Sequence, residues 1–289
     1  MVRAPGLLGI LLCGALLLGC QPGKDDTIVF SVSTAPRVLD PRLAADAASE
    51  RVNDLLFASL VELDERGIAR PGMATWESVD PLTYRLMLRD DRAPFGDGSL
   101  PSAADVVATY RAVLDPSTGS PHLSALKHVA SVEVVDAQTI EFGLQRVDPR
   151  LPSRLTLGIL PRELAETSQP VDRPIGSGTF EFIARDSRGS VLLERRRDGQ
   201  RVRFAPTADP TMRVLQLIRG EAHLVQNDLP SELYGYLAGR DEVELLQAPG
   251  ITFAYLGFNL DDPVLGQRPI REAIAHAIDR QAIMRYLFQ

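Results

Sequence analysis

The chain has few of the residues from which many catalytic and metal sites are built. Of its 289 residues, 2 are cysteine, 4 are histidine and 1 is tryptophan. Two cysteines cannot form the disulfide framework of a small secreted domain. No histidine has a second histidine or cysteine three or four residues away, which is the spacing typical of zinc sites. We therefore expect neither a zinc enzyme nor a thiol-dependent enzyme, and no resident metal or cofactor.

An excess of positive charge is also lacking. The chain has 31 Lys and Arg residues against 38 Asp and Glu residues, and its formal net charge is -7. A general nucleic-acid binder needs a basic surface to neutralise phosphates, so we expect no nucleic-acid partner. The hydrophobic fraction of 45% is ordinary for a globular protein, and the length allows one large domain or two ordinary ones.

The apolar run near the N-terminus, residues 7–18, is too short to span a bilayer comfortably. It follows a single cation, Arg3, and has the proportions of a signal peptide. The segment Leu17-Leu18-Gly19-Cys20 resembles the lipobox of bacterial lipoproteins, which implies cleavage after Gly19 and acylation of Cys20. More than one acyl chain gives durable membrane attachment.

We therefore predict a signal peptide over residues 1–19, followed by a lipidated Cys20 and a polar tether over residues 20–26. The protein is then exported and anchored in the lipid bilayer of the cell envelope. It faces the periplasm, or the outside of the plasma membrane in a cell with a single membrane. The alternative is an unmodified cysteine after an ordinary signal peptide.

From residue 27 onward, short β-type runs alternate with amphipathic helical runs, which predicts a mixed α and β fold. Helix-start signals occur at Ser102, at Asp209-Pro210 and at Pro269. The last of these helices carries an apolar stripe that the periodicity alone predicts to face a core. Strands are expected over residues 27–32, 83–89 and 179–184, and a hairpin is expected from residues 132–135 and 139–144.

Other segments that could carry chemistry favour a structural interpretation. Gly176-Ser177-Gly178 lacks the spacing of a nucleophile elbow and the third glycine of a dinucleotide-binding loop. We interpret it as a turn in which small residues let the backbone enter a strand. Adjacent carboxylates such as Asp90-Asp91 and Asp261-Asp262 are typical of solvated turns, although a facing pair across a cleft cannot be recognised from one sequence.

Ten segments occur in the order found in one family of proteins. They are Leu39-Asp40-Pro41, Leu60 to Asp64, Met73-Ala74 with Trp76-Glu77, Tyr84 to Arg89, Asp97-Gly98, Ala104 to Val107, Leu114-Asp115-Pro116, Pro174 to Phe180, Tyr255 to Asn259 and Ile270 to Arg280. Together they resemble the family 5 extracellular solute-binding proteins, which are the oligopeptide, dipeptide and nickel-binding receptors of ABC importers. The resemblance covers about residues 28–289.

The resemblance implies an α/β fold of the periplasmic-binding-protein-like clamshell type (type II, family 5 style), whose two lobes close around a ligand. The first lobe is then essentially complete over residues 27–258, with an inserted subdomain at about 48–170. The second lobe is only begun, over residues 259–289. Because the lobe partners are missing on this view, the apolar residues at its start are expected to be exposed. They are Ile270, Ile274, Ile278 and Leu287.

The ligand-binding candidates also come from the resemblance. In the oligopeptide branch, the segment after L-D-P, the loop after the capped helix and the strand before L-G-F-N line the cleft. Carried over to this chain, these segments give Ala45, Asp46, Ala47, His122, Thr252 and Tyr255. An exposed loop position for His122 and a core position for Tyr255 remain open alternatives.

The resemblance implies a receptor with no catalytic residues. Its partners would be a small solute, foremost a di- or oligopeptide, and an ABC permease of the inner membrane. Opines, nickel chelates, haem and oligosaccharides are further ligands that the family scaffold accommodates. Two alternatives remain open: a lipoprotein hydrolase acting on cell-wall material, and a truncated remnant that binds nothing.

Overall fold

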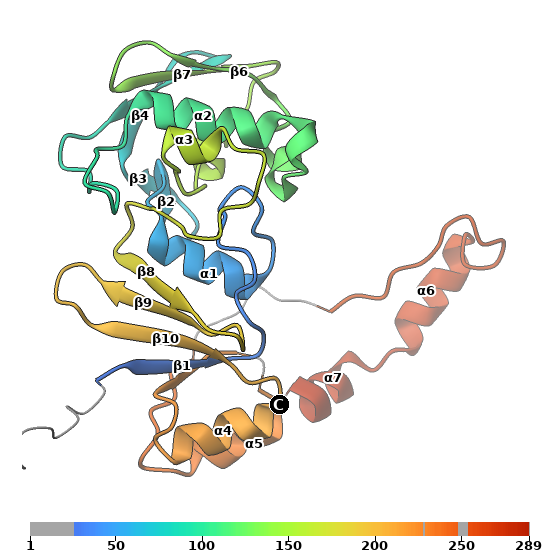
Figure 1. The fold of residues 1–289 in the computed structure, drawn as a ribbon. Helices are drawn as coiled ribbons and strands as arrows, with labels where there is room; N and C mark the ends of the chain where they lie inside the picture. Colours follow the sequence, from blue (N-terminus) through green and yellow to red (C-terminus); the bar gives the residue numbers. More distant parts are fainter. Residues whose placement is uncertain (1–25, 228, 248–253, 289) are drawn as a thin grey trace, which may run out of the picture. The chain divides into compact units, whose positions relative to one another are not determined.

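The computed structural model describes residues 26–227, 229–247 and 254–288, and Figure 1 shows the fold. The chain folds into two compact units. The first unit contains residues up to 29 and residues 35–204, and the second contains residues 30–34 and those from 205 onward. Strands β1 and β10 each contribute residues to both units. None of the helices within the described ranges is long and apolar enough to cross a membrane.

The first unit combines antiparallel sheets with helices. Its elements are α1 (Ala47–Leu56), β2 (Val61–Leu63), β3 (Ala69–Pro71), β4 (Ala74–Asp80), β5 (Thr83–Leu88), α2 (Ala103–Leu114), η1 (Pro116–Thr118), η2 (Pro121–Leu126), β6 (Val129–Val134), β7 (Thr139–Leu144), η3 (Pro152–Arg154), α3 (Arg162–Ala165), β8 (Phe180–Arg185), β9 (Val191–Arg195) and β10 (Arg201–Pro206). Strands β4, β5, β7 and β6 form one antiparallel sheet in that order. Strands β8, β9 and β10 lie side by side, again antiparallel (Figure 1).

The main core of the first unit lies between α2 and the four-stranded sheet, and α2 runs beside this sheet in Figure 1. Tyr110 of α2 packs edge-on against Phe142 of β7, with ring centroids 5.1 Å apart. The predicted alternation in β5 is confirmed, because Leu86 and Leu88 are buried whereas Met87 is exposed. The predicted hairpin is confirmed by the antiparallel pairing of β6 with β7.

The second unit contains one parallel strand pair and several helices. Its elements are β1 (Ile28–Val32), α4 (Pro210–Ile218), β11 (Leu224–Val225), α5 (Ser231–Ala238), α6 (Arg268–Ala277), α7 (Arg280–Ile283) and η4 (Met284–Phe288). Phe30 of β1 pairs with Leu224 of β11. Asp209 caps α4 as its sequence signal predicts, because its carboxylate accepts a hydrogen bond from the backbone N–H of Met212 at 2.8 Å.

The helix predicted after Pro269 is present as α6, but none of its side chains is buried. Ile270 is 36% exposed, and Ile274 and Ile278 are partly exposed. The core position that the periodicity predicts for these residues is therefore wrong, whereas the exposure implied by the family resemblance agrees with the structure. An amphipathic pattern defines which face of a helix is apolar without defining what covers that face. The side chain of Leu287 lies outside the described residues.

Candidate functional site

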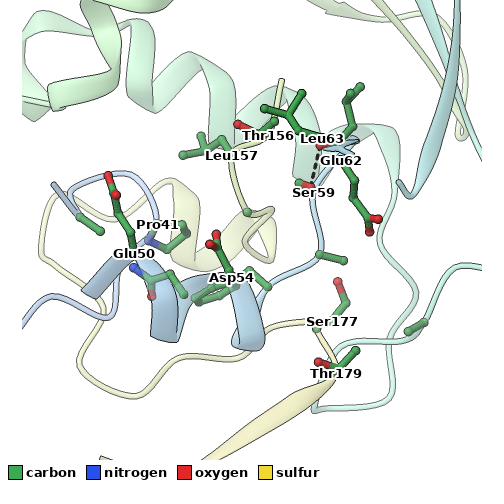
Figure 2. A pocket seen from close by; sticks show the side chains of 18 of the residues that line it. Pro41, Glu50, Asp54, Ser59, Glu62, Leu63, Thr156, Leu157, Ser177 and Thr179 are labelled. Carbon is green, nitrogen blue, oxygen red and sulfur yellow. Dashed lines mark hydrogen bonds between the residues drawn. The ribbon is translucent and has the colours of Figure 1, made fainter. Parts of the chain in front are cut away.

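A cavity of about 1440 Å³ lies within the first unit, and Figure 2 shows side chains that line it. Its walls come from α1, the 58–63 segment, the 93–94 loop, η2, the 153–158 segment, the 177–180 segment and the 195–197 segment. Typical small-molecule pockets measure about 300–1,000 Å³. This cavity is therefore large enough for a ligand of more than one amino-acid unit.

Helix α1 forms one wall, and its start is fixed by a sequence signal. Asp46 is the N-cap, and its carboxylate accepts hydrogen bonds from the backbone N–H groups of Ala48 at 3.2 Å and Ser49 at 2.9 Å. Positions 50, 53, 54 and 57 share one face of a helix, because residues three or four apart are neighbours on its surface. All four positions line the cavity.

The Gly176-Ser177-Gly178 segment packs against the C-terminal end of α1. The backbone N–H of Gly178 donates a hydrogen bond to the carbonyl oxygen of Leu56 at 2.9 Å. A Cβ atom on Gly176 would lie 1.9 Å from that same carbonyl oxygen. The interpretation of this segment as a turn of small residues leading into a strand is confirmed, since β8 begins at Phe180. The close approach also holds Ser177 in the cavity wall.

Two polar side chains of the wall are buried and have an atom without a hydrogen-bond partner. Asn53 is 5% exposed, and its Nδ2 donates to the carbonyl oxygen of Val38 at 3.2 Å. That bond fixes the orientation of the amide and leaves Oδ1 unpartnered on the described part of the chain. Ser177 is 2% exposed, and its Oγ is also unpartnered there. Buried polar atoms are usually hydrogen-bonded, and these two atoms have almost no exposed surface, so they are unsatisfied groups within the wall itself.

The cationic side chains of the cavity wall are engaged by the protein itself. Arg195 forms a two-point ion pair with Asp198, with both N–O distances at 2.8 Å. Arg196 donates hydrogen bonds to the carbonyl oxygens of Pro94 at 3.0 Å and Gly176 at 2.6 Å. These arginines therefore brace the loops that form the cavity.

Helix α1 contributes two carboxylates to the cavity wall, those of Glu50 and Asp54. Burial and the nearby charge of Glu50 raise the pKa of Asp54 above its usual value, and Arg51 only partly offsets this effect. Glu50 and Asp54 both line the cavity, and Figure 2 shows both in this wall. The wall formed by α1 therefore carries two carboxylates, and the surroundings of one of them, Asp54, disfavour its charged form.

A buried ion pair organises another part of the site. Arg42 and Asp40 are 2% and 0% exposed and form a two-point contact at 3.0 and 2.7 Å. The Oγ of Ser120 donates to the carbonyl oxygen of Arg42 at 2.7 Å and accepts from the backbone N–H of His122 at 3.3 Å. Through Ser120, the pair positions the start of η2, where His122 lines the cavity.

The model of the bacterial extracellular solute-binding proteins, family 5 middle, matches residues 40–289. The chain belongs to this family. The glutathione-binding protein GsiB of Escherichia coli strain K12 is 25% identical over 304 residues, and the match covers 99% of this chain and 58% of GsiB. The chain thus spans little more than half the length of the curated relatives it matches.

Solved structures of known binding proteins resemble this chain in fold. The ABC transporter substrate-binding protein CtaP of Listeria monocytogenes is 27% identical with a TM-score of 0.79, and the match covers 89% of this chain and 56% of CtaP. NikZ of Campylobacter jejuni, solved with Ni(L-His), is 24% identical with a TM-score of 0.79, over 90% of this chain and 55% of NikZ. The mixed α/β fold of this family 5 protein thus matches structures of periplasmic binding proteins.

The structure places the sequence-predicted residues of this family 5 protein in different surroundings. His122 lines the cavity, and its Nε2 is unpartnered within the described ranges. Ala45, Asp46 and Ala47 are exposed and lie between two lining residues, Ala44 and Glu50. A ligand contact stays a prediction for all four.

The remaining predicted residues lie elsewhere. Tyr255 belongs to the second unit and is 81% exposed, so it is not a core residue. Thr252 and the predicted lipidation site Cys20 lie outside the described residues. Ligand contact for Thr252 and Tyr255, and acylation of Cys20, stay predictions. The division of the chain into a first lobe, an inserted subdomain and the start of a second lobe is likewise a prediction.

Sequence reasoning missed Glu50, Asn53, Asp54 and Ser177. The N-cap at Asp46 marks the start of α1, and the polar residues at positions 50, 53 and 54 of that helix share one face. A polar stripe of this kind is also typical of a solvated helix face, so the pattern alone could not identify a ligand wall. Asn53 is buried whereas Glu50 and Asp54 are exposed, so only the tertiary structure shows that this stripe lies along a cavity.

Proposed function

We propose that this family 5 protein captures a small solute, foremost a di- or oligopeptide, and delivers it to an ABC permease. The observation that carries the proposal is the cavity of about 1440 Å³ in the first unit, which is lined by residues of α1, η2 and the 177–180 segment. The cavity volume is also sufficient for a short peptide.

The relatives make peptides the first class to test. GsiB is named as a glutathione-binding protein, and AppA of Bacillus subtilis was solved with a nonapeptide. AppA is 22% identical with a TM-score of 0.77, so it supports the fold rather than the ligand. We further propose that two lobes close around the solute and that differential affinity for the closed form drives this closure.

Attachment to the membrane is part of the same proposal. The apolar run over residues 7–18 and the Leu17-Leu18-Gly19-Cys20 segment support export and acylation of Cys20. A receptor held at the membrane surface releases its solute close to the permease. The protein then works as a lipoprotein anchored in the cell envelope, facing the periplasm or, in a cell with a single membrane, the outside of the plasma membrane, and it is not an enzyme.

Thermal unfolding with defined peptide pools tests the proposal. A ligand at about 100 times its Kd stabilises the native state by roughly 2.7 kcal/mol, which raises Tm by about 5–10 °C in a protein of this size. S177A is expected to reduce this shift, because it removes a polar atom from the wall. S187A, which changes an exposed serine in a turn outside the cavity, is the matched control.

Two outcomes would overturn the proposal. The first is the absence of any Tm shift with peptide pools that span di- to pentapeptides. The second is hydrolysis of a peptide or glycan by the purified protein, measured by mass spectrometry of the incubated pool. That second result would restore the alternative of a hydrolase acting on cell-wall material.

A further inference from the structure

We propose that the turn between β9 and β10 holds a subsite for a carboxylate of the bound solute, with Arg197 as the group that binds it. This inference rests on the proposed function, because it specifies which chemical group of a captured solute the first unit recognises. The turn connects two paired strands of one sheet, and residues 195–197 line the cavity. The side chain of Arg197 is 75% exposed, so a solute in the cavity can reach its guanidinium.

Backbone hydrogen bonds fix the turn that carries Arg197. The N–H of Arg195 donates to the carbonyl oxygen of Gln200 at 2.9 Å. The N–H of Gly199 donates to the carbonyl oxygen of Arg195 at 2.8 Å. Gly199 has a φ of 72°, a left-handed conformation that glycine adopts without strain. A closed hairpin therefore holds the backbone of Arg197 at a defined place in the wall.

Asp198 holds one edge of the Arg197 guanidinium. Its Oδ2 accepts a hydrogen bond from Nε of Arg197 at 3.2 Å. Asp198 is itself held by Nε and Nη2 of Arg195, both at 2.8 Å, and by the backbone N–H of Gln200 at 3.2 Å. Hydrogen bonds from Arg195 lower the pKa of Asp198 to about 2, so this carboxylate is ionised at neutral pH. The group that orients Arg197 is thus fixed and charged.

The two Nη groups of Arg197 have no hydrogen-bond partner among the described residues. They form the end of a planar fork whose parallel N–H groups match the two oxygens of a carboxylate. A guanidinium has donors and no acceptor, so an ammonium group is disfavoured here both by charge and by hydrogen bonding. Among the groups that a peptide carries, a carboxylate is therefore the one that this fork suits.

The charges around the turn leave one positive charge without a counter-charge. The arginines at positions 195–197 contact two carboxylates, those of Asp198 and Glu181. Asp198 forms its two-point pair with Arg195, and Glu181 lies 3.4 Å from Arg196. Three cations thus share two anions within the described part of the chain, and the third cation is the exposed one. A solute carboxylate would complete the balance.

The other cations of the cavity wall are held more fully by the protein than Arg197. Arg154 donates to a backbone carbonyl oxygen at 2.7 Å, and Arg196 donates to two of them at 3.0 and 2.6 Å. Glu194, which precedes the turn, is paired with Arg201 at 3.0 Å and so does not neutralise Arg197. Arg197 is therefore the arginine of this wall that is free to turn to a solute.

Isothermal titration calorimetry with two matched peptide pairs tests the subsite. Ala-Ala-Ala is compared with its C-terminal amide, and Ala-Glu-Ala is compared with Ala-Gln-Ala, so the pairs separate a C-terminal carboxylate from one on a side chain. In at least one pair we expect the form with the extra carboxylate to bind about tenfold more tightly, which corresponds to about 1.4 kcal/mol. This preference should shrink as salt is raised from about 20 to about 500 mM, since ions screen exposed charges.

Variants assign the preference to Arg197. R197Q removes the charge and the fork, so the preference should fall below about twofold. R197K keeps the charge but replaces the planar fork by a point charge, and it should keep only about a threefold preference. R188Q is the matched control, because Arg188 is an exposed arginine in the turn between β8 and β9, outside the cavity. R188Q should keep the tenfold preference, and circular dichroism and Tm confirm that each variant is folded.

The outcomes separate the subsite from the proposed function. If the members of each pair bind equally well, if R197Q keeps the tenfold preference, or if R188Q loses it as R197Q does, the subsite is wrong and the receptor function stands. The same holds if none of the four peptides binds although the peptide pools shift Tm. If none of the four binds and the pools produce no Tm shift, the subsite and the proposed function both fall.

Discussion

The buried pair of Asp40 and Arg42 leads to a strong prediction about stability. Oδ1 of Asp40 accepts hydrogen bonds from the backbone N–H of Arg42 at 2.9 Å and from its Nε at 3.0 Å. Oδ2 accepts from Nη2 of Arg42 at 2.7 Å and from the backbone N–H of Val171 at 3.1 Å. Each carboxylate oxygen therefore faces two donors. In D40N, either orientation of the amide points an NH₂ group at two of these donors.

The magnitude follows from these contacts. D40N loses two hydrogen bonds and leaves the guanidinium of Arg42, which is 2% exposed, without a counter-charge. Arg42 keeps hydrogen bonds to the carbonyl oxygens of Ala165 at 2.7 Å and Thr167 at 3.1 Å, which offset part of the penalty. Breaking a buried ion pair by removing one partner costs about 3–5 kcal/mol. We expect D40N to lower the free energy of unfolding by about that amount.

Urea unfolding followed by circular dichroism measures this change. D91N is the matched control, because Asp91 and Arg89 also form a two-point pair two residues apart, at 2.9 and 2.7 Å. Asp91 is 69% exposed, so D91N should cost less than about 1 kcal/mol. D40N/R42M removes the stranded cation and should be no less stable than D40N. Equal costs for D40N and D91N would refute the reasoning.

Three further predictions concern the cavity and the N-terminus. G176A should destabilise the protein by about 3 kcal/mol in urea unfolding, because its Cβ would meet the backbone oxygen of Leu56 at 1.9 Å. The control G235A has open space around the added Cβ and should not destabilise the protein. Equal costs for the two variants would contradict the close-packing argument. The pKa of Asp54 is raised in the folded state, so its favourable contribution is complete below about pH 4 and is lost as pH rises through the folded pKa. D54N should therefore stabilise the protein at pH 7, by no more than about 1 kcal/mol after solvent screening, and this gain in stability should disappear in thermal unfolding scans near pH 3. A loss of stability at pH 7 would contradict the predicted direction. C20A should abolish incorporation of a labelled fatty acid and release the protein from the membrane fraction, whereas C13A should still be labelled.

Local sequence signals predicted the secondary structure well. The alternation in residues 83–88, the cap at Asp209 and the hairpin around residue 136 all depend on neighbouring residues, and the structure confirms each of them. The stripe on α6 is different, because its periodicity did not reveal what would cover Ile270. The candidate site was predicted only in part: His122 lines the cavity, whereas the family resemblance singled out positions 45–47 and not Glu50, Asn53 or Asp54, which also line it.

The sequence alone determined the family, the mixed α and β fold and the turn at Gly176-Ser177-Gly178, because these depend on the order of motifs and on local backbone preferences. Only the tertiary structure decided which polar residues are buried beside a cavity. Asn53 and Ser177 have no local signature of that role. The burial of Ser177 depends on the approach of residues 176–178 to the end of α1, more than one hundred positions away in the chain, and such long-range packing leaves no pattern within either segment.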